Sequence, residues 1–448
     1  MIRKTALSAS FLALTACASL APQTEVTGHE LVLPAAYDNA AGLTEAQTIE
    51  ADWWATFGSQ NLNALVTEAL GANQTLAAGI ANVDAARAAL KVSNASLLPQ
   101  ASASLSASSD TESGLDDVSS SGRLSASYEL DLFGANAASR AASQASLEAT
   151  LFSQRSLELT VQSDVASTYF NLLATREQLE VARRNLEISE RIFEIVEVRY
   201  KAGTISGYDV SSQRAQLATA RARIPELEAQ ITSLETSLAI LLGQVPQGFA
   251  APEEPILALE LPMAKPDLPS DLLLRRPDLL QEEANLRAAD ANVTVARAAF
   301  LPGVDLGAAL SSVLSGGGDL IGSISASLAQ TIFSGGRLEG QLESARARQA
   351  GQLASYRSAI LNALRDVDVS LTSIEANAQR EDQLLVAREA SKDALDAAEL
   401  RYRAGTDDLT SLLSAQQAYF TASDNYVQGR LNRLTAALNL YVALGGGY

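Results

Sequence analysis

The two halves of this 448-residue chain carry the same landmarks in the same order. The segment at 199–210 reads RYKAGTISGYDV and the one at 401–412 reads RYRAGTDDLTSL, so Tyr200 and Tyr402 lie 202 residues apart. Other matching segments, SLLPQASASLS and AFLPGVDLGAA among them, recur at nearly the same spacing. A repeat of this length indicates a duplicated half-protein rather than a short solenoid unit. Each half must therefore build the same combination of elements.

Apolar and polar side chains alternate in short segments of each half. Over 124–132, leucine, alanine and tyrosine alternate with serine, glutamate and aspartate, and 304–311 alternates similarly. A period of two predicts strands with one apolar and one polar face, so we predict β-hairpins over 98–132 and 302–333. Four short strands cannot close a barrel by themselves. The hairpins therefore either join those of further copies in a membrane or pack on a soluble core.

Each hairpin is followed by a long segment that contains no proline. The first runs from 134 to 201, and as an α-helix it would extend about 100 Å. A helix of this length needs partners along its side. Apolar seams with a seven-residue period are found at Val165, Leu172, Leu179, Leu186, Phe193 and Tyr200, and again at Leu217, Ile224, Ile231 and Leu238. We predict long antiparallel helical hairpins over 134–243 and 335–444, and hence a mainly α fold with a small β part.

A proline-rich segment separates the two repeats. Six of the twelve prolines lie between residues 244 and 270. Such a segment is typical of an extended linker outside the helices. We therefore divide the chain into a first repeat at 51–243, the linker at 244–270 and a second repeat at 271–448.

The N-terminus has the pattern of a secretion signal. Basic residues at positions 3 and 4 precede an apolar stretch that is too short to span a bilayer and that ends at Cys17. We predict a signal peptide over 1–16 and a polar tether over 17–50. The small residues before Cys17 resemble a bacterial lipobox, which implies that Cys17 is lipidated. The alternative is a buried thiol in an ordinary signal. Ala18 follows Cys17, and by family rules the absence of aspartate at this position indicates the outer membrane.

Composition excludes several classes of function. The chain has one cysteine, Cys17, and one histidine, His29, both near the N-terminus, so one chain has neither a disulfide framework nor a His/Cys metal site. The net charge of −19 argues against a nucleic-acid partner, because phosphate binding needs clustered Lys and Arg. We expect no enzyme active site, and no cofactor apart from the covalent lipid on Cys17.

Several motifs together resemble one family. They are the lipobox, WWATFGSQNLNALVTEAL, LLRRPDLLQEEANLRAADANVTVARAAFLP and the paired RY-x-AG-T segments. Their order and duplication resemble the TolC-like outer membrane factors, and LLRRPDL resembles the NodT-type lipoprotein branch that serves RND efflux pumps. The resemblance implies a homotrimer. Each protomer would contribute four strands to a transmembrane β-barrel in the outer membrane and its long helices to a periplasmic α-barrel.

The resemblance also implies a function. The chain would be the passive exit duct of a tripartite efflux pump, working with a periplasmic adaptor protein and an RND-type inner-membrane transporter, and gated at the periplasmic helix tips. The alternatives are the outer membrane channel of a type I protein secretion system and a lipid-anchored coiled-coil scaffold without a pore. The lipobox and LLRRPDL favour the efflux channel over the secretion channel.

The family's adaptor contacts fall on the two turns at the helix tips. By motif match they correspond to Gly203 and Thr204 in the first repeat and to Gly405 and Thr406 in the second. Glycine permits a tight turn and the close approach of another backbone. The alternative is that both glycines are simply left-handed helix C-caps, a role that is compatible with adaptor contact.

The family's periplasmic gate corresponds to four further residues. Tyr402 matches a tyrosine that bonds to an aspartate, here Asp209, and Arg403 and Asp407 match charged latch residues. The alternative is that Tyr402 is a coiled-coil core residue and Asp209 an N-cap. Family members often carry aspartates on the second tip helix. This chain has Ser411 and Ser414 at those positions, and so it departs from the family pattern.

Overall fold

The structure is a computed structural model. It describes residues 34, 36–37, 51–109, 118–262, 269, 271–315 and 318–447. The predicted signal peptide and the lipidation site Cys17 lie outside the described residues, as does most of the predicted tether.

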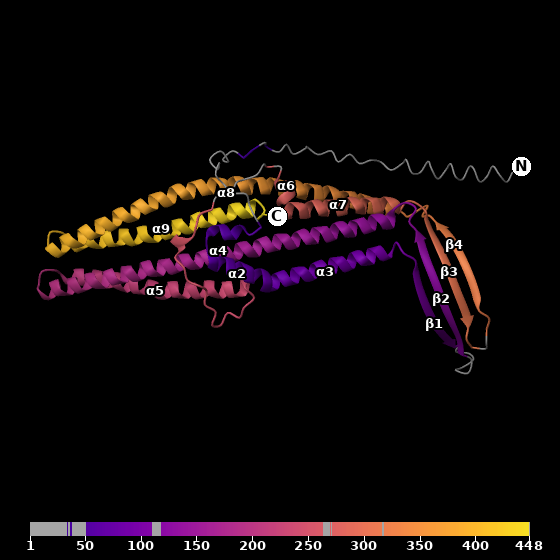
Figure 1. Cartoon of the computed structure of the whole chain (residues 1–448), viewed down its shortest axis with the longest axis horizontal. Coiled ribbons are helices and arrows are strands. Elements are labelled where there is room, and N and C mark those ends of the chain that lie inside the picture. Colours follow the sequence, from indigo (N-terminus) through magenta and orange to yellow (C-terminus); the bar gives the residue numbers. More distant parts are fainter. Residues whose placement is uncertain are drawn as a thin grey trace. The chain divides into compact units, whose positions relative to one another are not determined.

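The elements of the second repeat follow those of the first in the same order (Figure 1). The first repeat contains η2 (Trp53–Phe57), α2 (Gln60–Ala72), α3 (Gln74–Ala95), β1 (Gln100–Ser109), β2 (Val118–Leu130), α4 (Ala135–Lys201) and α5 (Gly207–Leu241). After η4 (Ile256–Ala258), the second contains α6 (Leu272–Arg275), α7 (Pro277–Ala298), β3 (Gly303–Val313), β4 (Ile321–Ala329), α8 (Arg337–Ala404) and α9 (Leu409–Ala443).

The long helices come in matched pairs. The first helix of each hairpin, α4 or α8, has 67 or 68 residues, and the returning helix, α5 or α9, has 35 in both repeats. The mainly helical fold and the predicted hairpins of helices and strands are therefore confirmed. None of the described helices is both long enough and apolar enough to cross a membrane.

Two compact units make up the structure, and each draws on both repeats. We call the first the sheet unit, since Asn82–Leu151 and Gln281–Ala359 contain all four strands. The second, which we call the tip unit, contains Phe152–Leu280 and Ile360–Tyr448, with the helical tips, and the segment that ends at Ala81. The compact units thus differ from the division by sequence repeat.

The sheet unit contains one antiparallel sheet in the order β1-β2-β3-β4. Its register places Leu124 opposite Leu310, while Ser102 lies opposite Ser125 with their hydroxyls 2.9 Å apart. One face is therefore apolar and the other carries serine, as the period of two predicts. In the isolated chain the apolar face is open to solvent, and Ile324 is 93% exposed. Within the described sheet, β1 and β4 have no partner on their outer edges.

The predicted seam of α4 is correct in its first part and wrong near the tip. Val165 and Leu172 are fully buried, but Tyr200 is exposed and the buried side chains near it are Ile192 and Val196. A straight helix drifts by about 20° per heptad from a strict seven-residue repeat. Near the tip the buried face of α4 also packs against the second helical hairpin, α8–α9, rather than along α5 alone.

The N-terminal segment of the tip unit is held by an aromatic cluster. The ring of Trp53 stacks on that of Tyr441 in α9, with centroids 5.5 Å apart, and Phe57 lies 5.1 Å from Phe170 in α4. The indole N–H of Trp53 donates to the side chain of Gln162. Buried aromatic pairs of this kind add about 0.5–1.5 kcal/mol beyond the area that they bury. The WWATF sequence therefore fastens the start of the described helices to the two repeats.

The linker is attached to both helical hairpins through its backbone. Arg176 of α4 donates to the carbonyl oxygens of residues 251 and 252 and pairs with Glu235 of α5 at 2.7 Å. Arg430 of α9 donates to the carbonyl oxygens of residues 257 and 259 and pairs with Glu381 of α8. Ile256 is fully buried. The part of the linker at 251–259 is thus more tightly packed than the external segment predicted from its prolines.

Candidate functional site at the helical tips

Each tip turn is a glycine C-cap followed by a threonine. Gly203 has a φ of 73° and Gly405 one of 75°. Their N–H groups donate to the carbonyls of Tyr200 and Tyr402, respectively. The N–H groups of Thr204 and Thr406 donate to the carbonyls of Arg199 and Arg401, both at 3.0 Å. This is the Schellman arrangement, in which only glycine avoids strain. The C-cap interpretation is therefore confirmed, while the adaptor contact stays a prediction.

The outer side of these turns is open. A Cβ built on Gly203 would meet no atom within 4 Å, and one on Gly405 would meet only the Arg199 guanidinium at 4.0 Å. The side chains of Thr204 and Thr406 fold back onto backbone carbonyls. Another backbone could therefore approach the turns without displacing side chains.

The start of the first returning helix has a capping box. Ser206 is the N-cap of α5, and its hydroxyl accepts from the N–H of Asp209. The Asp209 carboxylate accepts at 2.8 Å from both the N–H and the hydroxyl of Ser206. The predicted N-cap role of Asp209 is thus wrong by three positions, because serine takes the cap and the aspartate supplies the reciprocal bond.

The second returning helix is capped by an aspartate. Asp408 is the N-cap of α9, and its side chain accepts from the N–H of Ser411 at 2.8 Å. This hydrogen bond lowers the pKa of Asp408. Ser411 and Ser414 are exposed. Of the two acidic residues at this turn, Asp408 thus serves as a structural cap.

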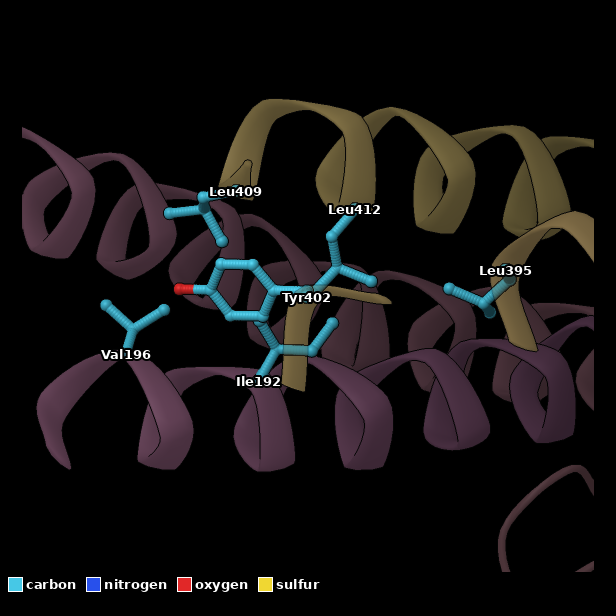
Figure 2. Packing of buried hydrophobic residues seen from close by; sticks show 6 residues of the cluster. All are labelled: Ile192, Val196, Leu395, Tyr402, Leu409 and Leu412. Atoms are coloured by element: carbon cyan, nitrogen blue, oxygen red, sulfur yellow. The ribbon is translucent and has the colours of Figure 1, made fainter. Parts of the chain in front are cut away.

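Tyr402 is a buried core residue (Figure 2). It is 1% exposed and packs with five other buried side chains, Ile192, Val196, Leu395, Leu409 and Leu412. The Arg199 guanidinium carbon lies 4.7 Å from the centroid of the ring, and Arg199 also donates to the Tyr402 carbonyl at 3.1 Å. Burial raises the pKa of the Tyr402 phenol, and Arg199 opposes this shift. One arginine thus joins the tips of the two hairpins.

The predicted bond between Tyr402 and Asp209 is not formed in the structure. The Tyr402 hydroxyl has no hydrogen-bond partner among the described residues. The Asp209 carboxylate is occupied by Ser206, and the Tyr402 ring is held by apolar packing and by Arg199. The core interpretation of Tyr402 is therefore confirmed, and the role of these residues in a gate stays a prediction.

Arg403 and Asp407 each form a hydrogen bond with a residue nearby in the sequence. The Arg403 guanidinium donates to Glu399, one turn earlier in α8. The Asp407 carboxylate accepts from the N–H of Asp408 at 2.9 Å. The structure therefore does not bring the two predicted latch residues together within one chain. Their contribution to a latch stays a prediction that concerns contacts with other copies.

A buried polar layer near the tips was not predicted. Ser189 and Gln213 are fully buried, and Gln416 is 1% exposed. The Gln416 side chain donates to Ser189 at 2.6 Å and to Asn185 at 3.0 Å, and the Gln213 side chain donates to the Ser189 carbonyl. A polar layer inside a coiled coil fixes the register of its helices. Its signal in the sequence is a polar residue within an otherwise apolar seam.

Comparisons with known proteins agree on one family. The model of the outer membrane efflux protein family matches residues 65–244 and 268–446. The pyoverdine export outer membrane protein OpmQ of Pseudomonas aeruginosa is 37% identical over 426 residues, which are 91% of this chain and 90% of that protein. The toluene efflux pump outer membrane protein TtgF of Pseudomonas putida is 31% identical over 430 residues, which are 90% of this chain and 87% of that protein.

A solved structure has the same fold. The open state of the Neisseria gonorrhoeae MtrE outer membrane channel superposes with a TM-score of 0.82 at 28% identity, over 95% of this chain and 98% of that one. The resemblance to the TolC-like outer membrane factors that the sequence motifs indicate is thereby confirmed. These relatives are channels rather than enzymes, and the helical part of the chain lies in the periplasm below the outer membrane. The chain belongs to the outer membrane efflux protein family.

Proposed function

We propose that three copies of this chain form the passive exit duct of a tripartite efflux system, gated at the periplasmic helix tips. The observation that carries the proposal is the isolated four-stranded sheet, whose apolar face is exposed and whose edge strands β1 and β4 lack outer partners among the described residues. The duct performs no chemistry. The energy for transport comes from the inner-membrane partner.

The sheet supports assembly with further copies. Backbone groups at an open sheet edge cannot face lipid without a hydrogen-bond partner, so strands in a bilayer must close into a barrel. Pairing of β4 of one copy with β1 of the next removes both edges. The apolar face, which includes Leu124 and Ile324, then contacts lipid, and the serine face lines the water-filled interior.

The tips support a gate and a docking site. The Arg199–Tyr402 contact holds the two hairpins of one chain together at the helical tips. The open glycine turns at Gly203 and Gly405 offer backbone that an adaptor hairpin can approach closely. We therefore propose that a periplasmic adaptor binds the turns and an RND-type transporter supplies the cargo. Lipid on Cys17 would add a membrane anchor.

The named relatives favour efflux over type I protein secretion. OpmQ is a pyoverdine export protein and TtgF belongs to a toluene efflux pump. Because chemically unrelated cargoes leave through related channels, we place the selection of cargo in the inner-membrane partner.

The test is single-channel conductance of the purified chain, with its mass measured in detergent. A trimer with small currents that rise when the tip contacts are weakened would support the gated duct. A monomer without conductance would refute it and leave a lipid-anchored helical scaffold. Copurification of the transporter distinguishes an RND partner from a secretion system.

A further inference from the structure

The arginine and tyrosine that meet at the tip both occur twice in the chain. A shift of 202 residues carries Arg199 onto Arg401 and Tyr200 onto Tyr402. The two tyrosines nevertheless lie in different surroundings, because Tyr402 is buried and Tyr200 is 51% exposed. The Arg401 side chain makes no ion pair, hydrogen bond or ring contact within the part of the chain that the structure describes.

We propose that Arg401 of one copy lies over the Tyr200 ring of the neighbouring copy. This contact rests on the proposed assembly of three copies. In a ring of such chains two kinds of junction alternate, one within a chain and one between chains. The rotation that carries the first hairpin onto the second also carries the second onto the first hairpin of the next copy. The Arg199–Tyr402 junction thereby predicts an Arg401–Tyr200 junction.

The charged contact beside this pair has no such counterpart. Arg191 of α4 pairs with Glu399 of α8 at 3.3 Å within one chain. The same shift turns this pair into Asp393 and Glu197, two carboxylates of like charge. An ion pair that holds the hairpins of one chain together is therefore replaced by repulsion between chains.

The glutamine contacts are also lost between copies. Gln216 and Gln417 bond to each other at 3.1 Å within one chain, and both correspond to alanines in the other repeat. Gln416 of the buried polar layer corresponds to Arg214. Among the described side-chain contacts that join the hairpins at the tip, the arginine–tyrosine pair therefore keeps both partners in the second junction.

The apolar surroundings of the second junction are smaller. Of the five buried side chains around Tyr402, four have smaller counterparts, since Ile192, Val196, Leu409 and Leu412 correspond to Ala394, Ala398, Gly207 and Val210. The fifth, Leu395, corresponds to the larger Phe193. Less apolar surface is then available to hold neighbouring copies together. The arginine–tyrosine stack accordingly carries a larger share of the junction between copies than of the one within a chain.

The test is chemical cross-linking of the full chain in its assembled form. Tyr200→Cys combined with Arg401→Cys is treated with a short bis-maleimide, and loss of the monomer band to dimers and trimers on a denaturing gel is expected. Arg199→Cys with Tyr402→Cys is the matched control, which should link within one chain and stay at monomer mass. Tyr200→Cys with Lys392→Cys, displaced by about 14 Å along α8, should not link. The unsubstituted chain gives the background.

Several results would overturn the contact. A trimer in which only the Arg199–Tyr402 pair links, or in which the displaced pair links equally well, refutes this contact alone. A monomeric mass refutes the proposed assembly and the contact with it. Conductance gives an independent readout, because Tyr200→Leu should raise it while Tyr200→Phe, which keeps the ring, should not. Equal currents from these two variants would contradict the proposal.

Discussion

Replacement of Tyr402 by phenylalanine is expected to leave the tip closed. The substitution removes a buried hydroxyl that has no partner among the described residues. Such a group costs about 1–3 kcal/mol when it is left without a hydrogen bond. The ring, its packing and its contact with Arg199 remain. The free energy of unfolding should therefore stay equal or rise.

Replacement of Tyr402 by leucine is expected to loosen the tip. It removes the ring over which Arg199 lies at 4.7 Å. A cation–π contact at a half-buried site contributes about 1 kcal/mol. If three junctions of the trimer open together, the closed state loses about 3 kcal/mol, which shifts the ratio of closed to open channels roughly 100-fold. Arg199→Met should loosen the tip at least as much, because it removes the cation and its hydrogen bond to the Tyr402 carbonyl while leaving the ring.

The measurement is single-channel conductance of the parent chain and the three variants, with trimer mass confirmed for each. The expected order places Tyr402→Phe with the parent and Tyr402→Leu with Arg199→Met at higher open probability. If Tyr402→Phe opens the channel as much as Tyr402→Leu, the hydroxyl is the latch and our reasoning from the ring is refuted.

Three further predictions concern stability. Glu381→Gln leaves the buried Arg430 without its carboxylate partner. It should lower the free energy of unfolding by about 3–5 kcal/mol in denaturant titration. The control Glu375→Gln changes an exposed glutamate and should alter this free energy little. Burial raises the pKa of Asp424 above its ordinary 3.8, so stability falls as the pH rises through the window above that value. Asp424→Asn should raise the melting midpoint at neutral pH and lose this advantage in acid, and a constant difference would contradict the assignment. Gly243→Ala places a Cβ 2.2 Å from the carbonyl oxygen at the end of α2 and should reduce the thermal midpoint far more than Gly203→Ala, which adds only strain of about 1–2 kcal/mol.

The elements of this fold are predictable because their patterns are local. Alternation with a period of two locates the strands, and the register that pairs Leu124 with Leu310 follows from keeping one face apolar. The long helices α4, α8 and α9 follow from proline-free stretches, whereas α5 continues through Pro225 and is supported by its apolar seam. The drift of the α4 seam near Ile192 was not predictable in the same way, because it depends on which hairpin packs against α4 at each level.

At the tip, some residue contacts can likewise be predicted from the local sequence and others cannot. The left-handed turn at Gly203 follows from its position after a helix. The sequence Ser206-Gly-Tyr-Asp209 contains the spacing of a capping box, so the actual partner of Asp209 was available from local rules. The burial of Gln416 was not, because the partner of a polar residue in a coiled coil is set by packing across helices.

The attachment of the linker has a consequence for how its sequence can vary. Arg176 and Arg430 bind peptide carbonyls, which every amino acid supplies whatever its side chain. Apart from the buried Ala251, Ile256 and Leu259 and from Glu254, whose carboxylate accepts from Tyr169 and Ser59, most described linker side chains can change without removing these attachments, provided that the backbone path is kept. Saturation mutagenesis should therefore find tolerance along the linker and intolerance at the two arginines, which lie far from it in the sequence.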